Sequence, residues 1–289
     1  MPACGPRVPD RGSEQATGTV SVAVSRGPQA GTRAGRMPGS RQRVFADARL
    51  QAKGNIMIDA VPILLVPGLG CSPSLFAPQL PGLWQFGPVS IVDTRRGASM
   101  ENIAGRILDA APPRFALAGL SMGGYVAFEI MRQAPERVLR LALLDTAPRA
   151  DRPEQSERRD AQIAMVREGR FAEIPKLLFP LMVHPEHQPD AELRDIFWRM
   201  FHENGPDAFI QQQEAIKGRP DSRPSLGAVS CPTLVLVGDS DQVTPPDAAR
   251  EIADGIPGAR LVIVPRSGHL STLEQPVAVT QALADWMTS

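Results

Sequence analysis

Short apolar runs alternate with helical stretches along most of this chain, and this alternation restricts the possible folds more than any other feature. The runs are β-branched or aliphatic and almost continuously apolar, as in strands that helices cover on both faces. They span residues 61–66, 89–93, 115–119, 139–144, 233–238 and 260–264. Strands that alternate with helices predict a parallel sheet joined by crossover helices. We therefore expect an α/β fold with a doubly wound, mostly parallel sheet.

The alternation stops between about Ala150 and Leu226, where helical patterns continue without strand signals. We interpret this stretch as a helical insertion that lies over the active edge of the sheet as a cap or lid. Its aromatic side chains are read singly as packing residues, and together they suggest an apolar lid. The expected division is a sheet domain over 57–149 and 227–289 with the cap insertion over 150–226.

Residues 1–56 differ from the rest in composition. Gly, Ser, Pro, Ala and Arg dominate there and no hydrophobic period is sustained, which predicts a disordered N-terminal extension. The Arg-rich, acid-poor character also suits an organelle transit peptide, although sequence upstream of a later start is the simpler account. Met57, directly before the first apolar run, offers such a start.

Composition argues against several classes of partner. Lys and Arg number 31, as do Asp and Glu, so charge gives no case for nucleic-acid binding. No apolar run reaches the roughly 18 residues of a membrane span. The three cysteines have unrelated spacings without a CxxC pair, so we expect no metal site and a reducing, cytoplasmic location. Neither glycine-rich nucleotide motif fits, and no cofactor is expected.

The strongest local signal is Gly119-Leu120-Ser121-Met122-Gly123, placed between a predicted strand and a helical run over 122–133. A serine on such a sharp turn has a strained backbone, and a β-carbon at either flanking glycine would clash. The turn exposes the hydroxyl and aims the N–H of Met122 at a developing oxyanion. A glycine-rich turn that only packs tightly, or that cradles a phosphate, is the alternative. The context favours a nucleophile at Ser121.

A serine nucleophile needs an imidazole to take its proton and a carboxylate to orient that imidazole. Of four histidines, His184, His187 and His202 fall in the insertion, whereas His269 follows the last predicted strand. A loop after the final strand lies at the carboxyl edge of the sheet, beside the serine turn. We therefore assign His269 as the base. His184 and His187 form an H-x-x-H pair, but no third metal ligand is evident and we treat them as lid residues.

Three aspartates compete for the role of the acid. Asp239 and Asp241 both lie in the loop that follows the predicted strand 233–238, and one of them should face His269. Asp145, at the end of another strand, is a rival position whose ordinary explanation is a helix or turn cap.

With these residues in place, the chain resembles the α/β-hydrolase family from about Val61 to Trp286, most weakly in the insertion. The resemblance implies a serine esterase-like enzyme and favours Asp241 over Asp239, because the order Ser121, Asp241, His269 matches the family order. It also implies that Leu69 supplies the second oxyanion N–H. The loop at Leu69 carries Pro67 where the family usually has histidine, a change that leaves the main-chain donor intact. Cys71, nearby, is read as a packing residue.

The resulting hypothesis is hydrolysis of a small carboxylic ester through an acyl-enzyme, with a small acyl compound as the only expected partner. A lactone, a thioester, carbon–carbon cleavage, perhydrolysis or acyl transfer could use the same three residues. A non-catalytic receptor that keeps the fold as a ligand cage is the alternative of another class. Reaction with a fluorophosphonate probe would separate the receptor from the enzymes.

Overall fold

The computed structural model describes residues 60–289, so the expectations for residues 1–56 and for Met57 lie outside the described residues, as does Cys4, one of the three cysteines. Six strands form one sheet in the order β2-β1-β3-β4-β5-β6, and every neighbouring pair is parallel. The strands are β1 (Ile63–Val66), β2 (Val89–Ile91), β3 (Phe115–Leu120), β4 (Val138–Leu144), β5 (Thr233–Gly238) and β6 (Arg260–Val264). The predicted α/β class with a doubly wound parallel sheet is confirmed.

The bounds of four strands differ from the prediction by one or two residues: β1 and β2 are shorter, whereas β3 extends to Leu120 and β4 begins at Val138. β5 and β6 have the predicted bounds. β1 begins at Ile63 because the N–H of Val61 donates to Phe86 O, 2.9 Å away, outside the ladder. β2 ends at Ile91, where its pairing with β1 stops. Apolar character continued past both ends, so the sequence could not show where pairing stops.

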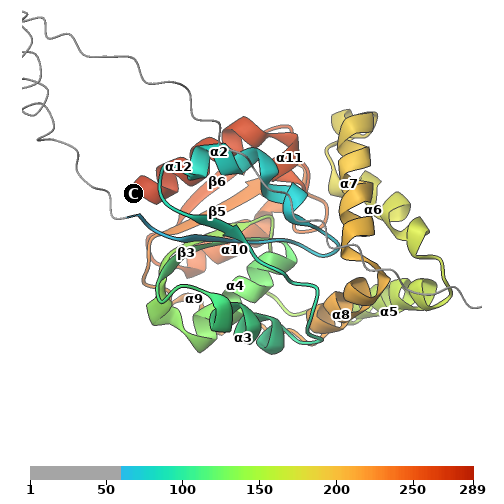
Figure 1. The fold of residues 1–289 in the computed structure, drawn as a ribbon, viewed down its shortest axis with the longest axis horizontal. Coiled ribbons are helices and arrows are strands. Elements are labelled where there is room, and N and C mark those ends of the chain that lie inside the picture. The colour runs from blue at the N-terminus through green and yellow to red at the C-terminus, as the bar shows by residue number, and fades with distance from the viewer. Residues whose placement is uncertain (1–59) are drawn as a thin grey trace, which may run out of the picture. The chain divides into compact units, whose positions relative to one another are not determined.

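Helices cover both faces of the sheet (Figure 1). One layer packs on the face that carries Ala118 and Leu236, and a second on the face that carries Leu117 and Val235. The first layer contains η1 (Pro73–Gln79), α2 (Leu80–Leu83), α11 (Ser271–Glu274) and α12 (Pro276–Thr288). The second contains α3 (Met100–Ala110), α4 (Met122–Gln133), α9 (Arg223–Leu226) and α10 (Pro246–Gly255). Alternate residues of each central strand therefore enter different cores.

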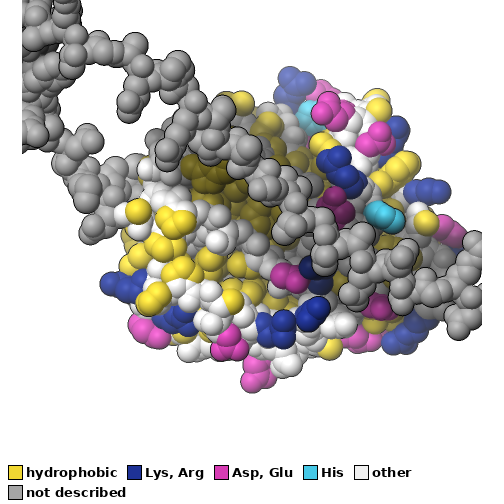
Figure 2. Space-filling view, viewed as in Figure 1, with side chains coloured by type: hydrophobic (Ala, Val, Ile, Leu, Met, Phe, Trp, Pro, Cys, Tyr) yellow, Lys and Arg dark blue, Asp and Glu magenta, His cyan; other side chains and the backbone are white. Residues whose placement is uncertain are grey.

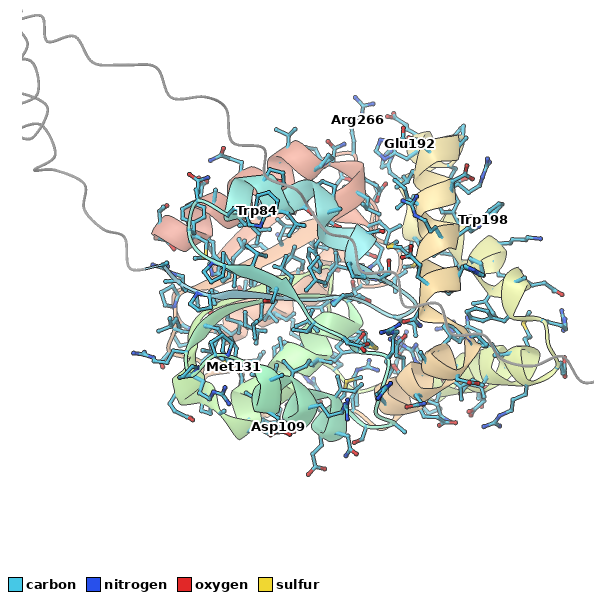
Figure 3. The ribbon with its side chains drawn as sticks, in the orientation of Figure 1. Trp84, Asp109, Met131, Glu192, Trp198 and Arg266 are labelled. Carbon is cyan, nitrogen blue, oxygen red and sulfur yellow. The ribbon has the colours of Figure 1, made fainter. Side chains whose placement is uncertain are left out.

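Between β4 and β5 the described chain forms helices without strands, at the right of Figure 1. They are α5 (Pro153–Arg167), η3 (Phe171–Glu173), α6 (Ile174–Met182), η4 (Pro185–His187), α7 (Ala191–Asn204) and α8 (Pro206–Lys217). We propose that this run is the cap, with the boundaries 150 and 226 expected from the sequence. Phe197, Phe201 and Phe209 are buried, and the ring of Phe201 makes tilted contacts with the other two, as the packing interpretation expects. Trp198 instead points outward from α7 and is 37% exposed (Figure 3).

The strand order locates a crevice at one edge of the sheet. β1 and β3 are neighbours, but the chain leaves β1 for η1 and α2 on one face of the sheet and leaves β3 for α4 on the other. In open parallel sheets, such a reversal leaves a crevice outside the carboxyl ends of the strands, where ligands bind. The loops after β1 and β3 meet at this reversal. The loops that follow β5 and β6 reach the same edge.

The surface is mixed in charge, as the equal numbers of acidic and basic residues lead one to expect. Figure 2 shows Lys and Arg interspersed with Asp and Glu over the cap, rather than gathered by sign. Within residues 60–289, no helix combines the length and apolar character that crossing a bilayer requires.

Candidate active site

Ser121 lies between β3 and α4 with backbone angles of φ 57° and ψ −116°. Few residues other than glycine adopt a positive φ, and such strain concentrates at functional sites. The turn is held from β4, because the N–H of Ser121 donates to Leu144 O at 2.9 Å and Thr146 Oγ1 donates to Ser121 O at 2.9 Å. The neighbouring strand thus compensates for the strain and fixes the serine at the sheet edge.

The glycines that flank the serine turn have no room for a side chain. A β-carbon on Gly119 would lie 2.2 Å from Gly123 O, and one on Gly123 would lie 2.0 Å from Val66 O. Both neighbours are main-chain atoms that cannot rotate away. The predicted need for glycine at these two positions is confirmed.

Replacing Gly123 by alanine is expected to lower the free energy of unfolding by about 1–3 kcal/mol or more, because the methyl group must displace the β1 backbone. Gly227→Ala is the matched control. Gly227 has φ −65° and ψ −14°, which alanine adopts, and an added β-carbon meets nothing within 4 Å. Its substitution should change stability by no more than about 1 kcal/mol and in the stabilising direction. Urea unfolding of both variants measures the difference, and equal stabilities would contradict the steric account.

Asp241 and His269 form a buried pair at the ends of β5 and β6. Asp241 Oδ2 lies 2.7 Å from His269 Nδ1 and accepts from Thr244 Oγ1 at 2.8 Å. Asp241 Oδ1 accepts the N–H groups of Val243 and Thr244 at 2.8 and 2.9 Å. Because a carboxylate acceptor keeps the proton on Nδ1, Nε2 of the neutral ring is left as a proton acceptor. The sequence did not identify Thr244, since hydroxyl residues in loops are common.

Asp241 and His269 each shift the pKa of the other toward the charged form. Burial alone would raise the pKa of Asp241, but His269 and the Thr244 hydrogen bonds lower the pKa below its usual value. Burial alone would lower the pKa of His269, but the charge and hydrogen bond of Asp241 outweigh it and raise the pKa above that of free imidazole. The pair is therefore an ionised carboxylate that orients an unusually basic imidazole.

The other two aspartates occupy different positions. Asp239 accepts from the main-chain N–H groups of Arg266 and Ser267, at 3.0 and 3.2 Å, and closes the loop after β6. Asp145 is fully buried and accepts from Gly238 N at 2.9 Å and from Ser271 Oγ. Burial, and then the nearby charge of Asp241, raise the pKa of Asp145 well above its usual value. Of the three candidates, Asp241 alone is hydrogen-bonded to the imidazole.

Ser121 and His269 line one cavity of about 380 Å³. Nε2 of His269 is buried and has no hydrogen-bond partner among residues 60–289. No hydrogen bond between Ser121 and His269 is formed in this conformation of the described chain. Catalytic hydrogen bonds are often long in unliganded enzymes and tighten when substrate binds. The structure thus brings nucleophile and base candidates to one cavity, with the acceptor nitrogen unoccupied by protein.

The loop after β1 lies directly beside the serine turn. A β-carbon on Gly68 would come within 3.3 Å of the β-carbon of Ser121, and both Gly68 and Leu69 line the cavity. Gly70 N donates to the buried side chain of Gln212 in the cap at 3.0 Å, which fixes this loop. Gln212 gave no recognisable sequence signal, since its partner is 142 positions away.

Two residues near Ser121 were assigned roles from the sequence, Met122 as an oxyanion donor and Cys71 as a packing residue. Met122 is the first residue of α4, so its N–H has no acceptor within the helix. The Met122 side chain is buried in the core and is not part of the cavity wall. Burial raises the pKa of the Cys71 thiol to about 12, so the thiol stays protonated at neutral pH. Cys71 is buried in the hydrophobic core, as its interpretation as a packing residue expects, and it also lines the cavity.

The cap contributes both apolar and polar walls to the cavity. The apolar wall consists of Leu178, Leu181, Met182 and Ile216, from α6 and α8. The polar wall consists of Gln155, Arg158, Arg159 and Gln162, all from α5. The expected apolar lid is therefore correct for only part of the cavity. Charged residues on a helix usually face solvent, so the sequence gave no reason to place those of α5 at the site.

The cap is also attached to the histidine loop by main-chain and carboxylate hydrogen bonds. Met182 O accepts from His269 N at 2.9 Å and from Leu270 N at 3.1 Å. The buried carboxylate of Glu274 accepts from Gly268 N at 2.9 Å, from His184 N at 2.6 Å and from His187 Nδ1 at 2.9 Å. His184 and His187 therefore belong to the joint between cap and core, whereas His202 is exposed on α7.

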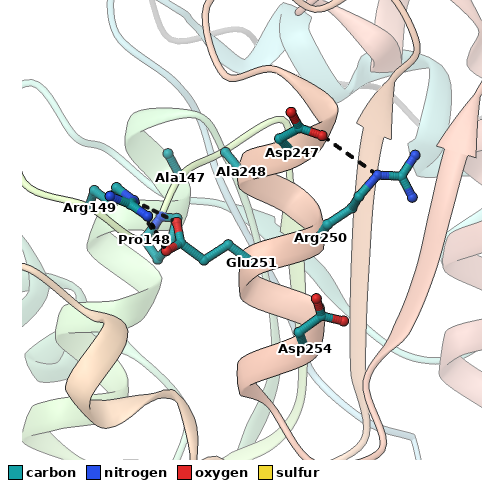
Figure 4. A pocket seen from close by; sticks show the side chains of 8 residues that line it. All are labelled: Ala147, Pro148, Arg149, Asp247, Ala248, Arg250, Glu251 and Asp254. Carbon is teal, nitrogen blue, oxygen red and sulfur yellow. Dashed lines mark hydrogen bonds and ion pairs between the residues drawn. The ribbon is translucent and has the colours of Figure 1, made fainter.

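A wider hollow of about 500 Å³ lies between α10 and the chain that follows β4 (Figure 4). Four of its five charged side chains pair with one another, Arg149 with Glu251 at 2.7 Å and Arg250 with Asp247 at 3.8 Å. Neither Ser121 nor His269 lines it. The volume of a cavity therefore does not identify the active site here, whereas the strained Ser121 and the nearby His269 do.

Comparison with known proteins agrees with this arrangement. Residues 96–276 match the family described as alpha/beta hydrolase fold. The chain is 32% identical over 196 residues to the pimeloyl-[acyl-carrier protein] methyl ester esterase of Nitrosomonas europaea, a match that covers 64% of this chain and 77% of that protein.

Two solved structures are similar over most of their length. A thermophilic esterase from Thermogutta terrifontis shares 31% identity at a TM-score of 0.72, covering 79% of this chain and 89% of that one. The enol-lactonase from Burkholderia xenovorans LB400 shares 26% identity at a TM-score of 0.74, covering 80% and 92%. The chain belongs to the α/β-hydrolase fold family, and it is a hydrolase.

Proposed function

We propose that the protein hydrolyses a small carboxylic ester through an acyl-enzyme formed on Ser121. The observation that carries this proposal is the shared cavity of Ser121 and His269, in which Asp241 holds Nδ1 of the imidazole and Nε2 has no partner among residues 60–289. A hydroxyl becomes nucleophilic only when a base takes its proton. The shared cavity and the hydrogen bond from Asp241 support His269 as that base.

In the proposed reaction, Ser121 Oγ attacks the ester carbonyl carbon while its proton passes to His269 Nε2. The N–H groups of Leu69 and Met122 bind the negative oxygen of the tetrahedral intermediate. His269 then gives the proton to the departing alkoxide, which leaves as the alcohol. Water attacks the acyl-enzyme in the second half of the reaction, with His269 again as base, and the acid is released. Each oxyanion donor is expected to be worth about 3 kcal/mol.

The cavity favours a small substrate, because about 380 Å³ is near the lower end of the volumes that ligand pockets occupy. The relatives in Nitrosomonas europaea and Thermogutta terrifontis are named as esterases, which supports an ester. A lactone is the second candidate, because the relative from Burkholderia xenovorans is named as an enol-lactonase. Both substrates use the same residues, since a lactone is a cyclic ester.

Hydrolysis of p-nitrophenyl esters of increasing acyl length, alongside lactones, tests the proposal. We expect the highest kcat/KM with short acyl chains, because the cavity is small. A faster reaction with lactones than with every ester would replace the first candidate by the second. Labelling with a fluorophosphonate probe tests the catalytic role itself, and a folded protein that does not react would instead favour a non-catalytic ligand receptor.

The pH dependence of kcat/KM should follow the ionisation of His269. The base must be neutral, so activity is expected to rise with pH through the raised pKa of this residue, above the value of about 6.5 for free imidazole. Asp241→Asn removes the charge that raises the pKa and should move this rise to lower pH. Rates of p-nitrophenyl acetate hydrolysis from acidic to mildly alkaline pH measure both profiles. Identical midpoints in the two proteins would contradict the assigned pair.

We also propose a reducing, cytoplasmic location and a small molecule as the partner. Cys71 and Cys231 are free thiols within the described chain. Unpaired thiols persist most readily where glutathione and thioredoxin keep them reduced.

A further inference from the structure

Every polar side chain that α5 presents to the cavity has hydrogen-bond donors to offer. These side chains are Gln155, Arg158, Arg159 and Gln162. No carboxylate is among the described residues that line the cavity. The acidic residues of α5 are exposed and outside the cavity wall: Glu154, Glu157 and Asp160. The wall is therefore positively charged as well as polar.

Arg159 is fixed in place before any ligand binds. Its Nε donates to Asp151 Oδ2 at 2.6 Å, its Nη2 reaches Asp151 Oδ1 at 3.5 Å, and its Nη1 donates to Gln213 Oε1 at 2.8 Å. A guanidinium has five N–H groups, so one on each terminal nitrogen has no acceptor within residues 60–289. Because the side chain is already ordered, binding an anion would cost little conformational entropy.

The same hydrogen bonds determine which way the glutamines point. Gln213 must accept from Arg159 with its oxygen, because arginine only donates, so its amide nitrogen donates to Gln162 Oε1 at 2.5 Å. Gln155 Oε1 likewise accepts from Arg152 N at 2.9 Å. Both oxygens thus accept a hydrogen bond, whereas the amide nitrogens of Gln155 and Gln162 have no acceptor among residues 60–289. Such a wall is complementary to an acceptor-rich group.

The arginines at this wall carry more positive charge than the carboxylate that binds them can neutralise. Asp151 is shared between Arg159 and Arg219, whose Nη1 lies 2.6 Å from Asp151 Oδ1. These three residues therefore carry one net positive charge. Arg158 adds another, since it is exposed and forms no ion pair with any residue of the described chain. Within residues 60–289, the wall is therefore net positive: Arg158 lines the cavity without an ion-pair partner, and Arg159 shares its carboxylate with a second arginine.

We propose that the α5 wall is a carboxylate subsite, and that the substrate is an ester that carries a second, ionised carboxylate. The class of substrate is the half-esters of small dicarboxylic acids. Arg159 offers fixed donors to the carboxylate oxygens, Arg158 adds charge at the cavity wall, and the two glutamine amides complete the shell. The inference rests on the proposed ester hydrolysis, because it places the carboxylate in the cavity that holds Ser121.

The test compares esters that differ only in the far carboxylate. Monoethyl esters of dicarboxylic acids from succinate to suberate are assayed by acid release, beside ethyl hexanoate and the corresponding diethyl esters. We expect the best half-ester to exceed both neutral esters in kcat/KM by about tenfold or more, the range for a charge-assisted hydrogen bond. Neutral esters that react faster than every half-ester would overturn the subsite.

Arg158→Gln is the informative variant, because the residue is exposed and its loss leaves no buried charge. The ratio of kcat/KM for the half-ester to kcat/KM for ethyl hexanoate should fall about tenfold in this variant. Arg167→Gln is the matched control, since Arg167 is exposed on the same helix, carries the same charge and does not line the cavity. An unchanged ratio in Arg158→Gln, or an equal fall in Arg167→Gln, would contradict the proposal.

Inhibition provides a readout that does not depend on turnover of the half-esters. Free adipate should compete with p-nitrophenyl acetate in the wild-type protein and in Arg167→Gln, and about tenfold less strongly in Arg158→Gln. Hexanoate, with one carboxylate fewer, should compete less well than adipate. Active enzyme that does not distinguish these two acids would reject the subsite alone, whereas absence of any ester hydrolysis would reject the proposed function.

Discussion

Ser121→Ala is expected to lower kcat for ester hydrolysis by about a million-fold, because no other group would form the acyl-enzyme. The loss should appear in kcat, while KM changes little, since the hydroxyl reacts but contributes little to substrate binding. His269→Ala should have a similar effect, and the double variant should be no worse than either single one, because the two residues act as one unit. Burst kinetics with p-nitrophenyl acetate measure the acylation step directly.

Stability measurements must accompany this experiment. Ser121 has a positive φ, so alanine there keeps the backbone strain and loses only the hydroxyl. We therefore expect a urea midpoint close to that of the wild-type protein. A Ser121→Ala protein that is folded and keeps more than about a hundredth of the wild-type kcat would eliminate the serine mechanism, because such a loss is far smaller than removing a nucleophile produces.

Asp241→Asn is expected to lower kcat by about ten-thousand-fold, because an amide no longer holds the imidazole in the required tautomer or stabilises its positive form. Asp145→Asn is the matched control. Asp145 is equally buried but bonds to Ser271 and Gly238 instead of the imidazole. Burial, and then the nearby charge of Asp241, raise the pKa of Asp145 well above the usual value, which favours the neutral form that an amide imitates. Activity should fall by less than about tenfold.

Asp145→Asn is also expected to change how the free energy of unfolding depends on pH. Because the pKa of Asp145 is raised in the folded state, folding takes up a proton at pH values between the usual pKa of about 4 and the raised pKa. Asp145 therefore contributes to the free energy of unfolding at acidic pH, and this contribution is lost as the pH rises through the raised pKa of the folded state. Asp145→Asn should flatten that decline, which unfolding free energies across the pH range measure. A large activity loss in Asp145→Asn with little loss in Asp241→Asn would exchange the two assignments.

Local signals explain what could be predicted from the sequence. The bounds of β5 and β6 followed from short apolar runs, because a strand covered on both faces must be apolar throughout. The position of Ser121 followed from two glycines that main-chain atoms of Gly123 and Val66 make necessary. Both features depend on neighbours close in the sequence or on a common arrangement of the fold.

Long-range contacts explain what could not be predicted. The choice between Asp241 and Asp145 depends on which carboxylate meets an imidazole from a loop that lies far along the chain. Arg158 and Arg159 resembled an ordinary solvated helix face, because nothing local shows that α5 turns this side to a cavity. The position of Gln213 is decided by a hydrogen bond across 54 residues. Such pairs have no periodicity and no spacing that a single sequence can reveal.

The Glu274 carboxylate, with donors from both sides of the joint, limits how this enzyme can be recombined with its relatives. A grafted cap with a different backbone near His184 would leave a buried negative charge without its donors, at a cost of about 3–5 kcal/mol. Successful hybrids should therefore inherit residues 182–187 together with the segment from Gly268 to Glu274. Crossover points placed between these two segments would produce chains that fail to fold even when every catalytic side chain is retained.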